Sequence, residues 1–297
     1  MTPTEFLERY RDFHRARGFH PRTLRCNTFE TASFFRFLGC SSVVEISEEH
    51  LLHYLNTLKN GYVERTARDK FRKLLAVLRW AARQGFLFSD PTRELGLRRV
   101  PEPLIAALTL GEVEAMLALP NPTTPGGLRD LALLEILYGT GLRLCEMHPL
   151  NLEDISFDPA QIRVSRSKGG SFRVVPFGPH LASILQRYLD EARPLLERRL
   201  KTRALLLSNK GQRLGRDMTL RTLRELAQAA GISKKVTTHS FRRAFATHLL
   251  QAGASLPQVK GLLGHAVTRS TERYTGLLAI DLAKEIRRCH PRGRKKS

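Results

Sequence analysis

The sequence predicts a mainly α-helical protein with a small β-sheet, organised as two domains. The chain has 297 residues, enough for two domains of roughly 100–200 residues each, and 42% of them are hydrophobic, so real cores can form. Apolar residues at helical spacing recur through residues 1–93. A single stretch of the remainder, residues 162–177, has the pattern of a β-hairpin instead.

The first domain, residues 1–93, is expected to hold four helices. Thr2 and Glu5 have the spacing of a capping box at the start of the first helix, and Gly39 is placed to end the second. Each helix carries an apolar face that predicts a shared core. The expected helices cover approximately residues 3–13, 23–38, 48–58 and 66–84.

The fourth of these helices carries a basic face with a single nearby acid, Asp69. A charged helix face is usually only solvated, but this excess of cations is better explained by contact with a phosphate backbone. The candidate DNA-binding residues are Arg68, Arg72, Arg79 and Arg83, which lie along about three to four turns of one face.

The charge of the whole chain supports a polyanionic partner. There are 49 Lys and Arg residues against 28 Asp and Glu, which gives a net charge of +21. An excess of this size indicates that the polyanionic partner is nucleic acid. The alternative is a protein that is basic but has no such partner.

The sequence also predicts the compartment. Its four cysteines are scattered and form no CxxC pair, which argues against a zinc site and gives no sign of a disulfide framework. It contains no apolar run near the roughly 18 residues that span a membrane, and its N-terminus is polar and acidic, unlike a signal peptide. We therefore expect a cytoplasmic protein, associated with the nucleoid and not with a membrane.

Residues 94–108, with two prolines and few core positions, are expected to be a linker. The second domain, residues 109–297, opens with a capping box of Thr109 and Glu112. Apart from the hairpin, whose two β-rich runs flank the turn KGGS, we expect this domain to be helical. Its basic tail, from His290, is expected to be loose.

Two places in the second domain offer cations for phosphate binding. Arg143 lies in the first turn of a helix that follows residues 139–141, close to backbone amides that favour anions, and Glu146 can orient it. Lys168 stands on the hairpin turn, from which it can reach into a groove. Taken alone, a surface ion pair and an ordinary turn residue explain these two features as well.

The end of the domain adds histidines and a tyrosine. His239 and Arg242, three residues apart, share a face of a helix that Thr238 is expected to cap. Gly264 ends a later helix and presents His265, and Tyr274 follows nine residues on. Arginine forks can clamp a phosphodiester, histidine can take a phenolic proton, and lysine can protonate the leaving oxygen. A tyrosine in such a field becomes a workable nucleophile without a metal, and no cluster of carboxylates is present to hold Mg²⁺.

Four motifs carry a resemblance to a known family: GTGLRLCE, SKGGSFRVVP, HSFRRAFAT and LLGHAVTRSTERY. In this order and at these spacings they resemble the tyrosine recombinases of the phage-integrase superfamily, most of all the Xer and Xer-like branch. The resemblance implies that Tyr274 is the nucleophile and Glu146 a support. The other implied catalytic residues are Arg143, Lys168, His239, Arg242 and His265.

This sequence departs from the family pattern at a few positions. Arg243 stands where the second arginine box usually has a histidine, and Ser167 replaces a common glycine before Lys168. Neither change removes a member of the implied catalytic set.

The resemblance also implies an architecture and an activity. Residues 1–93 would be a helical, SAM-like core-binding domain and residues 109–297 the catalytic domain, and the two would close on duplex DNA as a C-shaped clamp. The enzyme would cut one strand to give a 3′-phosphotyrosine and a free 5′-hydroxyl. Strand exchange would proceed through a Holliday junction with no metal or other cofactor.

The implied partners are double-stranded DNA and other copies of the chain. Four protomers would act together and exchange a C-terminal helix, for which residues 278–288 are the candidate. They would act either alone or with a second recombinase, in chromosome-dimer resolution or in integration and excision of a mobile element. The alternatives are a type IB topoisomerase-like enzyme, which reseals its own strand, and a non-catalytic DNA-binding protein on the same fold.

Overall fold

The structure is a computed structural model that describes residues 1–39, 42–43, 46–93, 95, 107–165, 172–198, 201–264 and 285–292. The chain divides into two compact units, Met1–Leu104 and Ile105–Ser297, and each has its own hydrophobic core. We call them the N-terminal unit and the C-terminal unit. Most of the expected linker, residues 94 and 96–106, lies outside the described residues.

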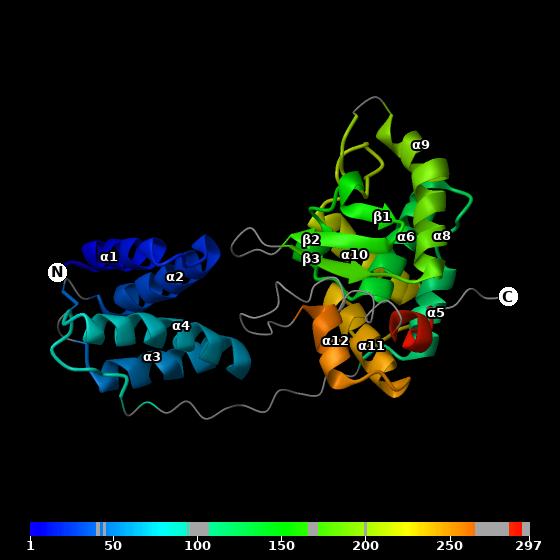
Figure 1. Cartoon of the computed structure of the whole chain (residues 1–297). Coiled ribbons are helices and arrows are strands. Elements are labelled where there is room, and N and C mark those ends of the chain that lie inside the picture. The colour runs from blue at the N-terminus through cyan, green and yellow to red at the C-terminus, as the bar shows by residue number, and fades with distance from the viewer. Residues whose placement is uncertain are drawn as a thin grey trace. The chain divides into compact units, whose positions relative to one another are not determined.

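Four helices make up the described part of the N-terminal unit, as predicted. The capping box of Thr2 and Glu5 is present, and Gly39 ends α2 with a φ of +62°. Two starts fall two residues earlier than expected: α2 begins with Pro21 at a position that proline favours, and α4 begins without a side-chain cap. The helices are α1 Pro3–Ala16, α2 Pro21–Leu38, α3 Glu48–Gly61 and α4 Glu64–Arg83 (Figure 1).

Aromatic side chains fill the core of the N-terminal unit, where α2 packs against both α1 and α4. The ring of Phe6 lies 5.6 Å from that of Phe35 and 5.8 Å from that of Trp80, both edge-on. The buried hydroxyl of Tyr10 accepts a hydrogen bond of 2.9 Å from Asn27 Nδ2. This bond joins a buried polar group of α1 to one of α2.

Helix α6 is the central element of the C-terminal unit (Figure 1). It is buried along most of its length and packs against α5, α8, α9 and α11, as expected of a helix that is apolar on nearly all sides. A π-helical segment, Tyr188–Ala192, joins α8 to α9. The helices are α5 Leu110–Ala118, α6 Pro125–Thr140, α7 Leu144–Met147, α8 Pro179–Arg187, α9 Arg193–Glu197, α10 Arg216–Ala229, α11 Thr238–Gln251 and α12 Leu256–Leu263.

The small β-sheet has three antiparallel strands in the order β1-β2-β3. The predicted hairpin is present as β2 Ala160–Ser165 and β3 Phe172–Pro176, and Ile162 of β2 pairs with Val175 of β3. The expectation that the rest of the domain is helical was wrong for β1, Ile155–Phe157. Three residues are too few to show the alternation by which a strand is recognised.

The expectation of a loose basic tail was wrong for His290–Arg292. His290 is only 4% exposed, and its Nε2 lies 3.1 Å from the carbonyl oxygen of Tyr138 on α6. The guanidinium of Arg292 contacts Glu135, also on α6. One helical turn just before them, residues 285–289, packs Ile286 and Cys289 into a small cluster with α11 and α12.

Candidate active site

The turn between α6 and α7 places Arg143 at the start of α7. Gly141 ends α6 with a φ of +61°, and a Cβ there would lie 2.7 Å from the ring of Phe245, so both conformation and packing require glycine. Arg143 occupies the N-cap position of α7. Its amide donates to Glu146 Oε2 at 2.9 Å and its Nη1 to Glu146 Oε1 at 3.0 Å. The expected pairing of Arg143 with Glu146 is therefore present.

Helix α11 brings Arg242 to the same place. Phe241, Phe245 and Leu249 are fully buried, as the stripe in the sequence predicts, and they fix the helix against the core. Arg242 is buried beside them and donates from Nη1 to Gly141 O and from Nη2 to Leu263 O, both at 2.6 Å. It thus connects the end of α6 with the end of α12.

His239 lies one turn before Arg242 but is exposed. The N-cap of α11 is Thr237, one residue earlier than expected, which leaves His239 in the first turn. The two side chains that the sequence placed on one face therefore differ strongly in burial.

Sequence reasoning missed a third arginine, Arg173 of β3. Its guanidinium forms a fork on Glu146, with Nη1 2.8 Å from Oε1 and Nη2 3.0 Å from Oε2. Arg242 Nη1 lies 4.0 Å from Glu146 Oε2. We call Arg143, Arg173, Arg242 and Glu146 the arginine cluster. The alternation along β3 could have shown that this arginine faces inward, because it lies on the same face of the strand as Val175, which is buried.

The arginine cluster holds three positive charges and one negative charge, so a net charge of +2 is gathered around one carboxylate. Burial alone would raise the pKa of Glu146, but hydrogen bonds from Arg173 and the Arg143 amide, with the charges of both, lower it to about 2. Burial, with the charge of Arg143, lowers the pKa of Arg242 to about 10. Glu146 and Arg242 are therefore both charged at neutral pH, and the surplus of positive charge in the cluster favours an anion.

Three of the predicted residues, Lys168, His265 and Tyr274, lie outside the described residues. Strand β2 ends at Ser165 and β3 begins at Phe172, so the described hairpin leads directly to the segment that contains Lys168. Helix α12 ends at Gly264, with a φ of +64°, immediately before His265.

The basic face of α4 is present on the N-terminal unit. The side chain of Arg72 is 65% exposed and that of Arg68 only 18%. Arg68 pairs with Glu64 at 2.7 Å, Arg72 pairs with Asp69 at 3.0 Å, and Arg79 Nε donates to Thr92 Oγ1 at 3.2 Å. The four predicted arginines therefore differ in how accessible they are.

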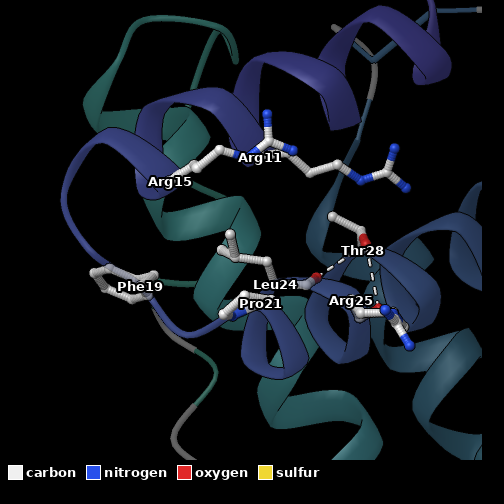
Figure 2. A pocket seen from close by; sticks show the side chains of 7 residues that line it. All are labelled: Arg11, Arg15, Phe19, Pro21, Leu24, Arg25 and Thr28. Atoms are coloured by element: carbon white, nitrogen blue, oxygen red, sulfur yellow. Dashed lines mark hydrogen bonds between the residues drawn. The ribbon is translucent and has the colours of Figure 1, made fainter. Parts of the chain in front are cut away.

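A second basic feature of this unit was not predicted. A cavity of about 270 Å³ is lined by Arg11 and Arg15 of α1 and by Arg25 of α2 (Figure 2). Its other lining residues are Phe19, Pro21, Leu24 and Thr28. The spacing of Arg11 and Arg15, four residues apart on one helix, was the signal in the sequence that could have shown it.

Within the described part of the chain, no group of three or more histidine, cysteine, aspartate or glutamate side chains is placed to hold a metal ion. The helices of that part include none with the length and apolar character needed to cross a membrane.

Comparison with known proteins identifies the family. The model of the phage integrase family matches residues 106–279, which is more than half of the chain. The chain belongs to the phage integrase family. It is 36% identical over 241 residues to the tyrosine recombinase XerD of Pseudomonas aeruginosa, covering 81% of this chain and 80% of that one. It is 34% identical over 264 residues to the tyrosine recombinase XerC of Oceanobacillus iheyensis, covering 88% and 86%.

Solved structures of integrases and recombinases share the fold of this family member. A lambda integrase tetramer bound to a Holliday junction matches with a TM-score of 0.69 and 18% identity, covering 92% of this chain and 81% of that one. The XerH site-specific recombinase bound to palindromic difH substrate matches with a TM-score of 0.67 and 21% identity, covering 88% and 78%. The mainly helical fold with a small sheet is confirmed.

The resemblance to the tyrosine recombinases is confirmed, and so is the predicted function. This family member is an enzyme of site-specific DNA recombination that cuts and rejoins DNA strands. The topoisomerase-like and non-catalytic alternatives are not favoured, because the relatives at this level of identity are tyrosine recombinases.

Proposed function

We propose that this recombinase cuts DNA with the phenol of Tyr274 and that the arginine cluster binds the phosphate under attack. The observation that carries the proposal is the cluster itself, in which the two arginines predicted from sequence motifs share one ionised carboxylate. Arg143, whose side chain is 33% exposed, is the member that a DNA phosphate can reach first. Arg242 provides positive charge from within the core.

The proposed reaction exchanges one ester bond for another. The Tyr274 oxygen forms a bond to phosphorus while the bond from phosphorus to the 5′-oxygen breaks. The phenolic proton passes to a histidine, His239 or His265, and Lys168 gives a proton to the departing 5′-oxygen. Arg143 and Arg242 stabilise the charge of the five-coordinate phosphorus. A 5′-hydroxyl of the partner duplex then attacks the phosphotyrosine, so each step conserves the number of ester bonds.

The proposed architecture assigns residues 1–93 to a DNA-binding domain, residues 94–108 to a linker and residues 109–297 to the catalytic domain. The two domains would close on duplex DNA as a clamp. The basic face of α4 supports the first assignment, because exposed arginines along a helix suit contact with successive phosphates. Inside the cell, the place of action would be the nucleoid in the cytoplasm.

The proposed assembly contains four copies of the chain, or copies of a second recombinase as well, acting through a Holliday junction. Lambda integrase forms a tetramer on such a junction. Exchange of residues 278–288 between protomers would require residues 285–292 to leave their own unit. The sites on α6 that receive His290 and Arg292 would then be filled by the same residues of a neighbour.

A nicked suicide substrate tests the proposed function. The DNA site is first selected from a random pool with the Tyr274→Phe variant, which keeps the ring but lacks the attacking oxygen. With this site, the native protein should become covalently attached to DNA, whereas Tyr274→Phe should bind with nearly unchanged affinity and never attach. A covalent complex that survives in the Phe variant would assign the nucleophile to another residue.

A further inference from the structure

Arg173 has no role in the reaction described above, yet its side chain joins three elements of the site. From β3 it forms the fork on Glu146 of α7. The stem and Nε of the same side chain lie against Gly264 at the end of α12, where an added Cβ would be 2.6 Å from Arg173 Nε. Arg173 therefore contacts both α7 and the residue that precedes His265.

Glu146 is the group through which Arg173 can act on the other arginines. Its carboxylate accepts from the amide and the Nη1 of Arg143 and lies 4.0 Å from Arg242 Nη1. The last torsion of a glutamate side chain is soft, so a carboxylate does not keep its plane by itself. Two parallel hydrogen bonds from one planar guanidinium do fix that plane. The fork of Arg173 thus fixes the plane of the Glu146 carboxylate, and this carboxylate in turn fixes the position of the Arg143 side chain.

The burial of Arg173 is not explained by packing alone. Its side chain is 9% exposed, and its buried Nε has no hydrogen-bond partner among the described residues. An unpaired buried donor costs stability, and an apolar pair of similar volume often supports a fold equally well. An arginine–glutamate fork at this position is therefore better explained by what it does to the arginines around it.

We propose that Arg173 is a positioning residue of the recombination reaction: by fixing the carboxylate of Glu146, it holds Arg143 and Arg242 at the spacing at which both can bind one phosphate. This inference rests on the proposed function of the arginine cluster. Arg173 is the second residue of β3, directly after the segment that contains Lys168. It therefore also ties the spacing of the two arginines to the hairpin that carries the lysine.

The first test replaces the fork but keeps the charge. Arg173→Lys cannot form two parallel bonds, so the saturated single-turnover rate of cleavage on the suicide substrate should fall by about tenfold or more. DNA affinity should stay within about threefold, because the variant keeps the positive charge. Arg163→Lys is the matched control on the neighbouring strand, since its side chain is 54% exposed and its ion pair with Asp154 is 3.6 Å long. The control should leave rate and affinity unchanged.

The second test is a double-mutant cycle with Glu146→Gln. If Arg173 acts through Glu146, the double variant Arg173→Lys, Glu146→Gln should be no more than about twofold slower than Glu146→Gln alone. Losses that multiply would overturn the proposal, as would an unchanged rate in Arg173→Lys. A rate loss matched by equal losses in DNA affinity and melting temperature would make Arg173 a structural residue only.

The two proposals fail in different ways. If the native protein never attaches covalently to DNA, or if Tyr274→Phe still attaches, the proposed function is wrong and the positioning role of Arg173 falls with it. If attachment depends on Tyr274 but the losses of the two substitutions multiply, the function stands and the positioning role of Arg173 is wrong.

Discussion

The arginines of the two units are held in opposite ways. On α4 of the N-terminal unit, Arg68 and Arg72 each pair with an acid three or four residues away on the same helix. In the C-terminal unit, three arginines converge on one carboxylate that is only 13% exposed, and they come from the N-cap of α7, from β3 and from α11. A local pair at the surface, such as Arg72 with Asp69, is weak and easily exchanged for phosphate, whereas a cluster built from three elements around one mostly buried carboxylate is fixed before a ligand arrives. The N-terminal arginines therefore suit affinity, and the C-terminal ones suit chemistry.

The contrast between affinity and chemistry is tested most directly by a residue that would affect only the rate of cleavage. Lys168 is such a residue, and its substitution should have the largest effect. General acid catalysis contributes roughly 10²–10⁴-fold to a rate, so Lys168→Ala should cleave normal DNA slower by about that factor. DNA with a 5′-bridging sulfur releases a thiolate, which needs little protonation. On this substrate the variant should recover most of its cleavage rate. An equal defect on both substrates would mean that Lys168 positions the DNA instead.

Replacing either of the two predicted arginines, Arg143 or Arg242, should slow cleavage by a similar factor. The two substitutions should differ in how much they destabilise the folded protein. Removal of one preorganised donor costs about 10²–10³-fold in rate at comparable sites, and we expect this of both Arg143→Ala and Arg242→Ala. Arg242→Ala also leaves the carbonyl oxygens of Gly141 and Leu263 without their 2.6 Å partners, at about 1–3 kcal/mol for each group left unpaired. Single-turnover cleavage and thermal unfolding measure the two effects. Equal melting temperatures for both variants would contradict the buried role of Arg242.

The C-terminal unit should also lose stability in mild acid. Burial lowers the pKa of His290 from 6.5 to about 4, so between these values the unfolded chain binds a proton that the folded chain does not. Stability therefore falls as the pH drops through this window, by up to about 3 kcal/mol. His290→Gln should remove this part of the pH dependence, measured by thermal unfolding at a series of pH values. The control is His53→Gln, because His53 of α3 is exposed. If this substitution changes the pH dependence of stability as much as His290→Gln does, the assignment to His290 is wrong.

Sequence motifs predicted the parts of this molecule that depend on neighbours in the chain. The capping boxes at Thr2 and Thr109 and the αL glycines at Gly39 and Gly264 involve contacts within a few residues, and all are present. The Arg143–Glu146 pair, one helical turn apart, is of the same kind. The fork of Arg173 on Glu146 spans 27 residues and depends on how β3 packs against α7, which no local pattern encodes. The docking of His290 on Tyr138, 152 residues away, was missed for the same reason.

The smallest expected effects are in the N-terminal unit, where each arginine should change affinity without changing the rate of chemistry. Arg72→Ala, Arg79→Ala and Arg83→Ala should each weaken binding to all DNA sequences. Each should also reduce the slope of log K against log salt by about one unit if one phosphate contact is lost. Arg68, which is mostly covered and paired with Glu64, is a matched control on the same helix and should change the slope less.

A residue that reads a base edge would behave differently: its substitution should cost roughly 1–3 kcal/mol on the selected site and much less on random DNA. Titrations at several salt concentrations, with selected and random duplexes, separate the two kinds of contact. If the fourfold variant Arg68→Ala, Arg72→Ala, Arg79→Ala, Arg83→Ala keeps the native affinity and slope, the face of α4 is only solvated. The DNA would then be expected at the cavity between α1 and α2, and Arg11→Ala and Arg25→Ala should reduce the slope there instead (Figure 2). The contrast between affinity in one unit and chemistry in the other would survive that result, because Arg11 and Arg25 are also exposed, whereas the arginines of the C-terminal unit are held by the shared carboxylate of Glu146.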